Sequence, residues 1–415
     1  MNTFTVVFLA ALLAATATRL WLGNRHVRHV QAHRDRVPEG FADQITLAAH
    51  EKAASYTAAK TRLTLVHVVV DALVLLVLTL GGVLNWLDAA WRAVLGPGLW
   101  SGLALIGSAV VILSAIDVPL SWYRTFRIEA RFGFNQTTLA LFVSDLVKQA
   151  VVGVAVGAPL LAAVLWLMAE MGSNWWLYVW LVWVAFSIVM LVVYPTYIAP
   201  LFNEFAPMQE GDLKRRIEAL LVKCGFRSQG LFVMDGSKRS SHGNAYFTGF
   251  GRAKRIVFFD TLLSRLDPPE IEAVLAHELG HFKLRHVAKR MLFTFAVSLA
   301  FLWVLGQLMG EQWFYQGLGV STPSTAMALL LFFLVMPVFT FLLQPLVSVY
   351  SRKHEFEADA YAAQQSSAAD LAHALVKLYK DNASTLTPDP LHSAFYDSHP
   401  PAALRIARLQ HSVPA

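Results

Sequence analysis

The chain contains a single cysteine, Cys224, and little charge: Asp, Glu, Lys and Arg make up 15% of its 415 residues. One cysteine excludes an intramolecular disulfide and a zinc module built from paired thiols. An apolar fraction of 56% excludes an intrinsically disordered chain. Soluble domains carry roughly 25% charged residues, so this much apolar surface does not fit in a water-soluble core. The composition therefore places the chain in a membrane.

Seven apolar stretches have about the 20 residues that a helix needs to cross a bilayer. They are Phe4–Trp21, Leu63–Leu84, Leu103–Leu120, Ala150–Met168, Trp176–Tyr194, Met291–Met309 and Ala326–Val347. The first stretch is also compatible with a secretory signal peptide, because Ala15-Thr16-Ala17 has the form of a cleavage site. Its basic residues follow the apolar stretch instead of preceding it, which favours a membrane span.

Most of the basic residues, which give a net charge of +6, lie in loops on one side of the predicted bundle. Short cytoplasmic loops are enriched in Lys and Arg, so Gly23–Arg62 and Ser121–Gln149 are expected in the cytoplasm. The N-terminus is then outside, and residues 195–290 and 351–415 are cytoplasmic. Attraction to an anionic lipid leaflet explains why the chain carries more Lys and Arg than Asp and Glu. We therefore expect a lipid bilayer as partner and no nucleic acid.

A helix that carries a metal-binding pattern is expected to begin after Asp267. The run Asp267-Pro-Pro-Glu270 combines an N-cap residue, a first-turn proline and an acidic third residue. The helix contains HELGH, in which His277 and His281 share one face and can bind one zinc ion at about 2.0–2.1 Å. Glu278 can hold a water on that ion and accept its proton. The alternative is a pair of surface histidines on an amphipathic helix.

A catalytic zinc site usually has three protein ligands and one open position. The long form of the motif, with a third histidine on the same segment, is excluded because position 287 is Val287. Glu355 and Asp359, one helical turn apart just past the seventh span, are better candidates. Glu355 is the predicted third ligand, and Asp359 is predicted to accept a hydrogen bond from a zinc-bound histidine. His354 is an alternative ligand, Glu357 is expected to point away, and a solvated helix face is the alternative for both carboxylates.

HELGH and, after a membrane helix, EFEAD resemble the type I CAAX prenyl proteases, which are membrane zinc endopeptidases that process farnesylated proteins. Other segments resemble that family as well: Arg131–Asn135, Pro200–Asn203, Gly243–Gly249 and Ser398–Pro401 together with Arg405. With its seven spans, the resemblance covers nearly the whole chain. It implies a water-filled chamber enclosed by the helices, with the active site at its cytoplasmic end. The shorter HtpX-type proteases share both metal motifs but typically lack three of the N-terminal spans.

The resemblance also implies roles for residues outside the two metal motifs. His399 is expected as a catalytic residue that stabilises the oxyanion, and Arg405 as a substrate-binding residue. Without the resemblance, a histidine before Pro-Pro is more often an ordinary loop residue. Asn244–Thr248 is the expected edge strand for holding an extended peptide. In the family that the chain resembles, the corresponding stretch flanks the metal site, and the resemblance therefore implies that Asn244 binds substrate. An ordinary strand after a glycine-rich turn is the alternative.

Three ionisable residues lie inside predicted spans: His67, Asp71 and Asp117. Placing an ionisable side chain inside a membrane costs free energy, and such residues often have a functional role. These three residues could form hydrogen bonds between helices, extend toward the membrane surface or line a chamber. Their roles stay open.

The predicted fold class is a mainly α membrane protein, a seven-transmembrane-helix bundle with a cytoplasmic, gluzincin-like zinc-metalloprotease part that contains a small β-sheet. We expect four parts: a membrane region with five spans (1–194), a metalloprotease segment (195–290), two more spans (291–350) and a C-terminal cytoplasmic segment (351–415). The sheet is expected from three β-prone runs, Gly230–Met234, Asn244–Thr248 and Arg255–Phe259, beside a helix at Asp212–Cys224.

The predicted function is zinc-dependent hydrolysis of peptide bonds near the C-terminus of prenylated CAAX-type or similar peptides, with one Zn²⁺ per chain. A quality-control protease of the HtpX type is the first alternative, and a non-proteolytic transporter or structural membrane protein is the second. The expected location is a bacterial inner membrane, or the endoplasmic reticulum of a eukaryote, with the active site facing the cytoplasm.

Overall fold

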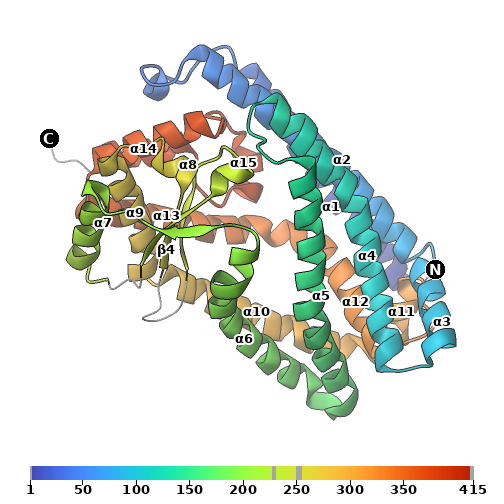
Figure 1. Cartoon of the computed structure of the whole chain (residues 1–415). Coiled ribbons are helices and arrows are strands. Elements are labelled where there is room, and N and C mark those ends of the chain that lie inside the picture. The colour runs from blue at the N-terminus through green and yellow to red at the C-terminus, as the bar shows by residue number, and fades with distance from the viewer. Residues whose placement is uncertain (1, 227–229, 249–254, 412–415) are drawn as a thin grey trace.

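The computed structural model describes residues 2–226, 230–248 and 255–411. Long helices form one part of the molecule, and a smaller part combines short helices with a sheet (Figure 1). This arrangement confirms the predicted mainly α class with a small β-sheet.

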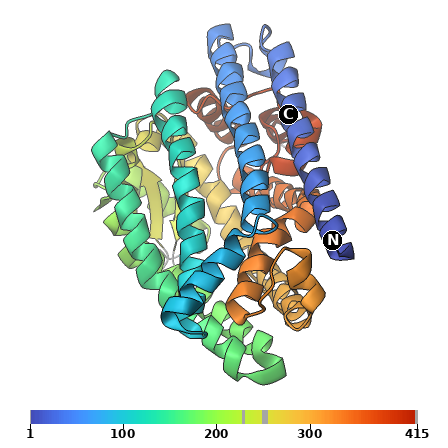
Figure 2. The same cartoon turned by 90° about the vertical axis from the view of Figure 1, so that its right-hand side faces the viewer.

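Seven segments of the described chain are long and apolar enough to cross a membrane, as predicted. Their helices are α1 (Thr3–Ala32), α2 (Leu47–Leu78), α4 (Leu99–Tyr123), α5 (Leu139–Glu170), α6 (Trp175–Val193), α10 (His286–Leu308) and α12 (Thr325–Thr340). Helix α1 runs unbroken through Ala15-Thr16-Ala17 and packs lengthwise against α2 (Figure 2). Its Phe8 and Leu22 are fully buried, so the first apolar stretch is part of the bundle.

The second span ends before the predicted boundary at Leu84. The chain turns at Gly81-Gly82, where Gly82 has a φ of 80°, a conformation that glycine adopts without strain. A separate helix, α3 (Val83–Leu95), then begins and buries Leu84 and Leu87. Another short helix, α11 (Gln312–Gly317), precedes α12. The predicted second span runs on into α3, because the apolar residues continue through the turn and hydropathy alone does not separate the two helices.

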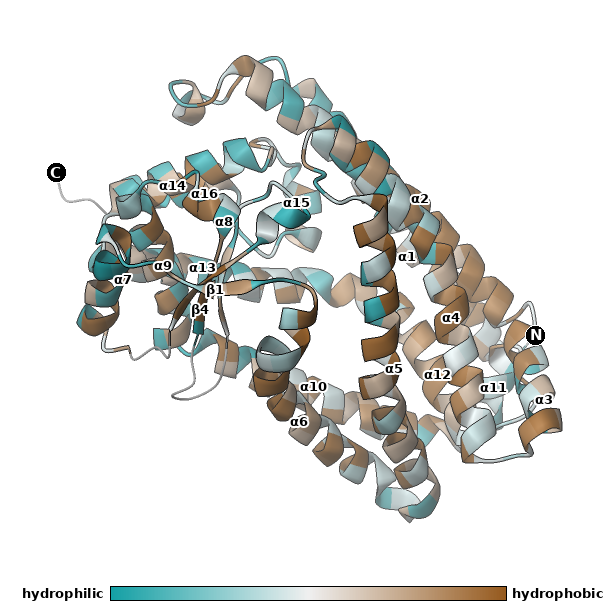
Figure 3. Cartoon of the chain, viewed as in Figure 1, coloured by the Kyte–Doolittle hydropathy of each residue, from teal (hydrophilic) through white to brown (hydrophobic). Residues whose placement is uncertain are grey.

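The membrane helices differ in how much of their surface other helices cover. Only 6% of the most apolar window in Gly172–Leu201 is buried, compared with 56% in Thr325–Gln365. Helix α12 is therefore central, and α6 exposes apolar side chains suited to lipid (Figure 3). His67 of α2 lies 3.8 Å from Asp117 of α4, so these two span residues face each other from neighbouring helices.

Helix α13 (Gln344–Gln365) connects the seventh span to the smaller part of the molecule. It follows α12 after a 3-10 turn at Phe341–Leu343, with Pro345 in its first turn. The seventh span thus ends at a short break between two helices, just before Pro345. Beyond it, α13 continues without interruption to Glu355 and Asp359, so the end of the span and both carboxylates belong to one helix.

The sheet has four strands in the order β1-β2-β4-β3. They are β1 (Phe205–Pro207), β2 (Leu231–Met234), β3 (Ala245–Thr248) and β4 (Arg255–Phe259). Strand β2 is parallel to β4, and both outer strands are antiparallel to their neighbours. The three predicted strands are present, β3 lies at an edge as expected, and β1 was not predicted.

Helices α7 (Asp212–Lys223), α8 (Asp260–Leu263), α9 (Pro268–Lys283), α14 (Ala368–Asp381) and α16 (Ala402–His411) share a core with this sheet, whereas α15 (Pro390–Tyr396) packs against the membrane helices. Their shared core includes Ile217 of α7, Phe258 of β4 and Leu279 of α9, all fully buried. Helix α9 is therefore held on several sides, which fixes the side chains that it presents.

Candidate active site

Helix α9 begins where the sequence predicts and is anchored at its first turn. The Glu270 carboxylate accepts a hydrogen bond from the backbone N–H of Asp267 at 2.8 Å. Lys377 of α14 donates to Asp267 at 2.7 Å and to Glu270 at 2.8 Å. This capping box and its lysine fix the start of the helix that carries His277 and His281.

Three side chains from α9 and α13 converge on one point. The two Nε2 atoms of His277 and His281 are 3.2 Å apart, and the Glu355 carboxylate lies 3.5 Å from the first and 3.4 Å from the second. Tetrahedral zinc ligands at about 2.05 Å are about 3.3 Å from one another. Glu355 Oε2 is buried and has no hydrogen-bond partner, as expected of an atom that binds an ion. These residues fit one metal ion.

Gly280 allows the two ligand-bearing helices to approach each other. A Cβ atom at this position would lie 3.0 Å from the Cα of Ala358 and 3.2 Å from its carbonyl oxygen. Any side chain would push α13 away from α9. The glycine within HELGH therefore sets the distance between the histidines and Glu355.

The second nitrogen of His277 contacts Asp359, as predicted. His277 Nδ1 lies 2.8 Å from Asp359 Oδ1, and Arg405 of α16 donates to both oxygens of that carboxylate, at 2.8 and 2.6 Å. Arg405 is only 5% exposed. The structure brings Arg405 to the site, but its paired contact with Asp359 favours a role in holding that carboxylate over the expected contact with substrate.

The second nitrogen of His281 contacts His286, which sequence reasoning missed. The two Nδ1 atoms are 3.0 Å apart, and His286 Nε2 lies 2.9 Å from Glu357. If His281 binds a metal through Nε2, its Nδ1–H donates to His286, whose Nε2–H donates to Glu357. Glu357 thus points away from the ligand atoms, as expected, but not into solvent. His354 stacks on His286 at 4.0 Å and lies outside the predicted ligand group.

The electrostatics of the site favour a cation between the two imidazoles. Burial alone would lower the pKa of His277, but its contacts with Asp359 and Glu355 outweigh burial and raise the pKa to about 9. Burial and the neighbouring His277 lower the pKa of His281 to about 3. The surroundings thus favour one positive charge shared near the pair, a charge that a metal cation can supply.

The remaining predicted residues lie around this cluster at different distances. Glu278 follows His277 on α9, and burial raises its pKa. His399, after α15, has its Nε2 atom 3.4 Å from Glu355 and a side chain that is 61% exposed. Asn244 is exposed at the start of β3, where its side chain accepts a hydrogen bond from its neighbour Ala245.

The strand that Asn244 precedes contacts α9, which keeps that segment near the candidate site. The Asn244 side chain accepts a hydrogen bond from its neighbour Ala245 and has no described contact with the ligand group. Gly249, the last residue of the motif noted around this strand, lies outside the described residues.

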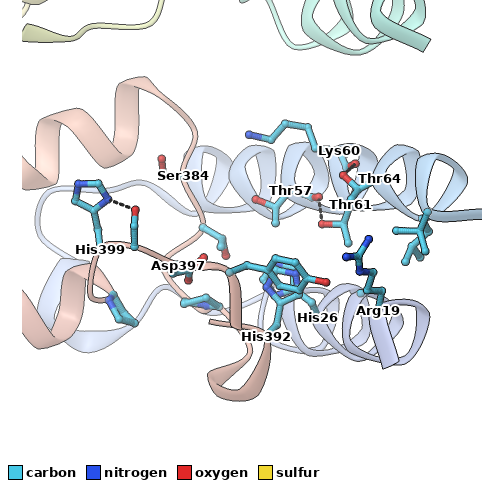
Figure 4. A pocket seen from close by; sticks show the side chains of 18 of the residues that line it. Arg19, His26, Thr57, Lys60, Thr61, Thr64, Ser384, His392, Asp397 and His399 are labelled. Atoms are coloured by element: carbon cyan, nitrogen blue, oxygen red, sulfur yellow. Dashed lines mark hydrogen bonds between the residues drawn. The ribbon is translucent and has the colours of Figure 1, made fainter. Parts of the chain in front are cut away.

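A cavity of about 500 Å³ opens beside His399. It is bordered by α1, α2 and the segment from α14 to Pro401, just before α16 (Figure 4). His399 thus borders both the ligand group and this cavity, and its Nδ1 contacts the Ser398 hydroxyl at 3.0 Å.

Two family models together match nearly the whole chain. Residues 26–204 match the CAAX prenyl protease N-terminal region with five membrane helices, and residues 207–413 match peptidase family M48. The chain belongs to peptidase family M48. This peptidase is therefore an integral, multi-pass membrane metalloendopeptidase, and the transporter alternative is wrong.

Relatives of this M48 peptidase cover most of its length. It is 37% identical to a CAAX prenyl protease 1 homologue of Arabidopsis thaliana over 89% of each chain, and 32% identical to one of Caenorhabditis elegans over 96% of each. The human homologue is 35% identical over 73% of this chain and 72% of its own. The crystal structure of S. mikatae Ste24p superposes with a TM-score of 0.90 at 29% identity, covering 99% of both chains. The predicted family resemblance is confirmed.

Proposed function

We propose that this M48 peptidase binds one Zn²⁺ per chain and hydrolyses a peptide bond near the C-terminus of CAAX-type, prenylated or similar peptides. The observation that carries the proposal is the spacing of 3.2 to 3.5 Å between the ligand atoms of His277, His281 and Glu355. That spacing, together with two imidazoles and one carboxylate, suits zinc with one position left for water.

Bound zinc would polarise the scissile carbonyl and make a bound water more acidic. Glu278, adjacent to the ligand His277, accepts the proton from that water and passes it to the leaving amine. Its raised pKa suits the first step, because a buried carboxylate takes up a proton more readily than an exposed one. His399, exposed beside the ligand group, donates to the oxyanion as the carbonyl is attacked.

Asp359 and Arg405 act on the reaction through His277. Asp359 accepts from the non-ligating nitrogen and so fixes the ring orientation, and Arg405 fixes Asp359. Substrate is held as an extended strand on the free edge of β3, where backbone groups can pair with a peptide. Asn244, at the start of this edge, is the proposed polar contact to the peptide.

The CAAX-type substrate class is supported by the relatives, whose names include CAAX prenyl protease 1 in plants, animals and fungi. The distribution of basic loop residues supports an active site that faces the cytoplasm. The proposed location is a bacterial inner membrane, or the endoplasmic reticulum if the source is a eukaryote.

The test uses purified enzyme in detergent with a fluorogenic prenylated peptide and its unprenylated twin. Wild type should cleave the prenylated peptide, and Glu278→Gln should reduce cleavage by about 10³-fold or more while retaining stoichiometric zinc by mass spectrometry. Residual cleavage near the wild-type rate in Glu278→Gln would overturn the mechanism. Equal cleavage of both peptides by wild type would instead favour the quality-control function.

A further inference from the structure

A polar cluster joins two membrane helices to the segment that leads into β3. The Tyr56 hydroxyl of α2 donates to the carboxylate of Glu129, whose two oxygens lie 2.8 and 2.7 Å away. Glu129 ends the π turn Arg124–Glu129, which continues α4. His242, two residues before Asn244, places its Nε2 atom 3.4 Å from the Tyr56 oxygen and 3.7 Å from Glu129 Oε2. Side chains from three distant parts of the chain thus meet at one carboxylate.

The rest of the His242 ring is also held in place. Asn382, just after α14, has its Oδ1 atom 3.1 Å from His242 Nδ1, and the same oxygen accepts the backbone N–H of Gly243 at 3.2 Å. That atom is a carbonyl acceptor, so His242 Nδ1 donates to it. Phe134 stacks on the ring at 4.4 Å, and its backbone oxygen accepts the N–H of Ser241 at 3.1 Å. His242 is therefore fixed between the membrane helices and α14.

The charges around the cluster differ in how much water reaches them. The side chain of Glu129 is 14% exposed and Tyr56 is 1% exposed, whereas Arg124, 3.7 Å from Glu129, is 65% exposed. Lys60 lies over the Tyr56 ring at 4.0 Å. Buried, paired charges often stabilise a fold no more than apolar packing would. Their hydrogen bonds are directional and make a buried network rigid, so this cluster suits the holding of a segment in place.

The segment that the cluster holds continues directly into β3. The backbone oxygen of His242 accepts from the Thr261 hydroxyl at 2.9 Å, and that of Asn244 accepts the N–H of Phe259 at 3.0 Å. Within the part of the chain that the structure describes, β3 pairs on one side only, with β4, and it contacts α9. A shift of His242 would therefore move the unpaired edge of β3 relative to the helix that carries HELGH.

We propose that Glu129 and Tyr56 are positioning residues for the substrate: through His242 they hold the unpaired edge of β3 in the place where it pairs with an extended peptide. The inference rests on the proposed function, which assigns the substrate to this edge. Both residues belong to segments that qualify as membrane spans, Leu47–Leu78 and Leu99–Glu129, so the peptide-binding strand is tied to the membrane part of the molecule. A peptide paired in one register presents one bond to the ligand group.

The test combines a substitution in the cluster with a change in the peptide backbone. The fluorogenic CAAX-type peptide is compared with twins that each carry one N-methylated amide, outside the cleaved bond, which removes one donor for strand pairing. With wild type, at least one twin should have a kcat/KM about fivefold to tenfold below that of the parent peptide. In Tyr56→Phe this penalty should fall below about twofold, because the strand is no longer held in place and the two changes are coupled. Glu129→Gln keeps an acceptor for Tyr56 but loses the charge, so its penalty should be intermediate.

Tyr315→Phe is the matched control. Tyr315 is also 1% exposed, and its hydroxyl donates to the backbone oxygen of Met309 at 2.8 Å, but it lies in α11 among the membrane helices. This control should keep the full penalty of the N-methylated twin. Tyr56→Phe should in addition raise KM for the parent peptide while kcat and zinc content stay near the wild-type values, which is the pattern of weakened substrate binding alone.

A full N-methylation penalty in both Tyr56→Phe and Glu129→Gln would overturn the positioning role, and so would an equal loss of the penalty in Tyr315→Phe. If wild type cleaves every twin as well as the parent peptide, β3 does not pair with substrate, and the inference falls while the proteolytic function stands. If zinc-loaded wild type cleaves neither the parent peptide nor any twin, the proposed function fails and this inference with it.

Discussion

At the scale of single residues, the two histidines of HELGH are oriented by different groups. Asp359 contacts His277 directly, whereas His281 contacts the imidazole of His286, which Glu357 holds in turn. Both arrangements leave Nε2 free to bind a metal and place a proton on Nδ1. The stability of the metal site should therefore depend on residues that never touch the metal.

We predict that His286→Ala weakens zinc binding about 10- to 100-fold, because His281 loses the acceptor for its Nδ1–H. His286→Gln should retain part of the affinity, since an amide can accept from His281 and donate to Glu357. Competition with a zinc chelator measures the affinity, and the visible spectrum of the Co²⁺ form reports the ligand geometry. The exposed His373 supplies the control, His373→Ala. Unchanged affinity in His286→Ala would contradict the prediction.

The shared face of His277 and His281, and that of Glu355 and Asp359, were predictable because i, i+4 spacing places side chains on one helix face. His286 was not predictable in this way. It lies beyond the end of α9, and Arg285, with a φ of 58°, turns the chain so that His286 comes back to His281. Periodicity carries no information across such a turn. The contact between Arg405 and Asp359 likewise depends on the packing of α16, which spacing does not encode.

A second residue-scale prediction concerns acid stability. Burial and the His26 ring, stacked at 3.9 Å, lower the pKa of His392 to about 3, although the charge of Asp389 acts in the opposite direction. An unfolded histidine titrates near about 6.5, so the unfolded chain binds more protons below that pH. This contribution to stability is complete above about pH 6.5 and is lost as the pH falls toward 3.

We therefore expect the thermal midpoint of the detergent-solubilised protein to fall between about pH 7.5 and about pH 5, and to fall less in His392→Gln. The variant lacks the buried imidazole whose protonation favours unfolding. Differential scanning fluorimetry at both pH values checks this. An equal decrease in the variant and in wild type would assign the acid sensitivity to other groups.

At the scale of elements, the contact between α9 and α13 determines whether the ligands meet. Gly280 faces Ala358 across this contact with no room for a side chain. We predict that Gly280→Ala costs about 1–3 kcal/mol of stability and lowers zinc affinity, because α13 must move and carries Glu355 with it. Thermal unfolding and chelator competition measure the two effects.

The matched control is Gly153→Ala in α5. A Cβ there meets nothing within 4 Å, and alanine favours a helix over glycine by up to about 1 kcal/mol. Its stability should be unchanged or higher. If both alanine variants behaved alike, the close approach of α9 and α13 would not be the cause.

Elements that carry a strong local signal were predicted well. Helix α9 begins at its capping box, and apolar length identifies all seven spans. Strand β1 was missed because three residues are too few to show alternation, and it exists through pairing with β2. The boundary between α2 and α3 was missed because the turn at Gly82 interrupts the backbone without interrupting the apolar residues.

At the scale of the whole molecule, the proposed orientation can be tested with single cysteines. The native Cys224 is buried, which keeps background labelling low. Asp43, between α1 and α2, and Ser173, between α5 and α6, are exposed and are expected on opposite sides of the membrane. In intact cells of a bacterial host, a membrane-impermeant maleimide should label Ser173→Cys at once and Asp43→Cys only after permeabilisation. The reverse pattern would invert the orientation.

The ligand group also has a mechanical consequence for the chain. Helices α10 and α12 lie between α9 and α13 in sequence, so an ion held by His281 and Glu355 would fasten the two ends of a long loop that passes twice through the membrane. The metal would then stabilise the packing of the last two spans in addition to its role in catalysis. We expect the thermal midpoint to rise with the logarithm of free zinc above the dissociation constant, including in the inactive Glu278→Gln enzyme. Loss of the ion would thus loosen the bundle itself, and a zinc-poor cell would lose the protein along with its activity.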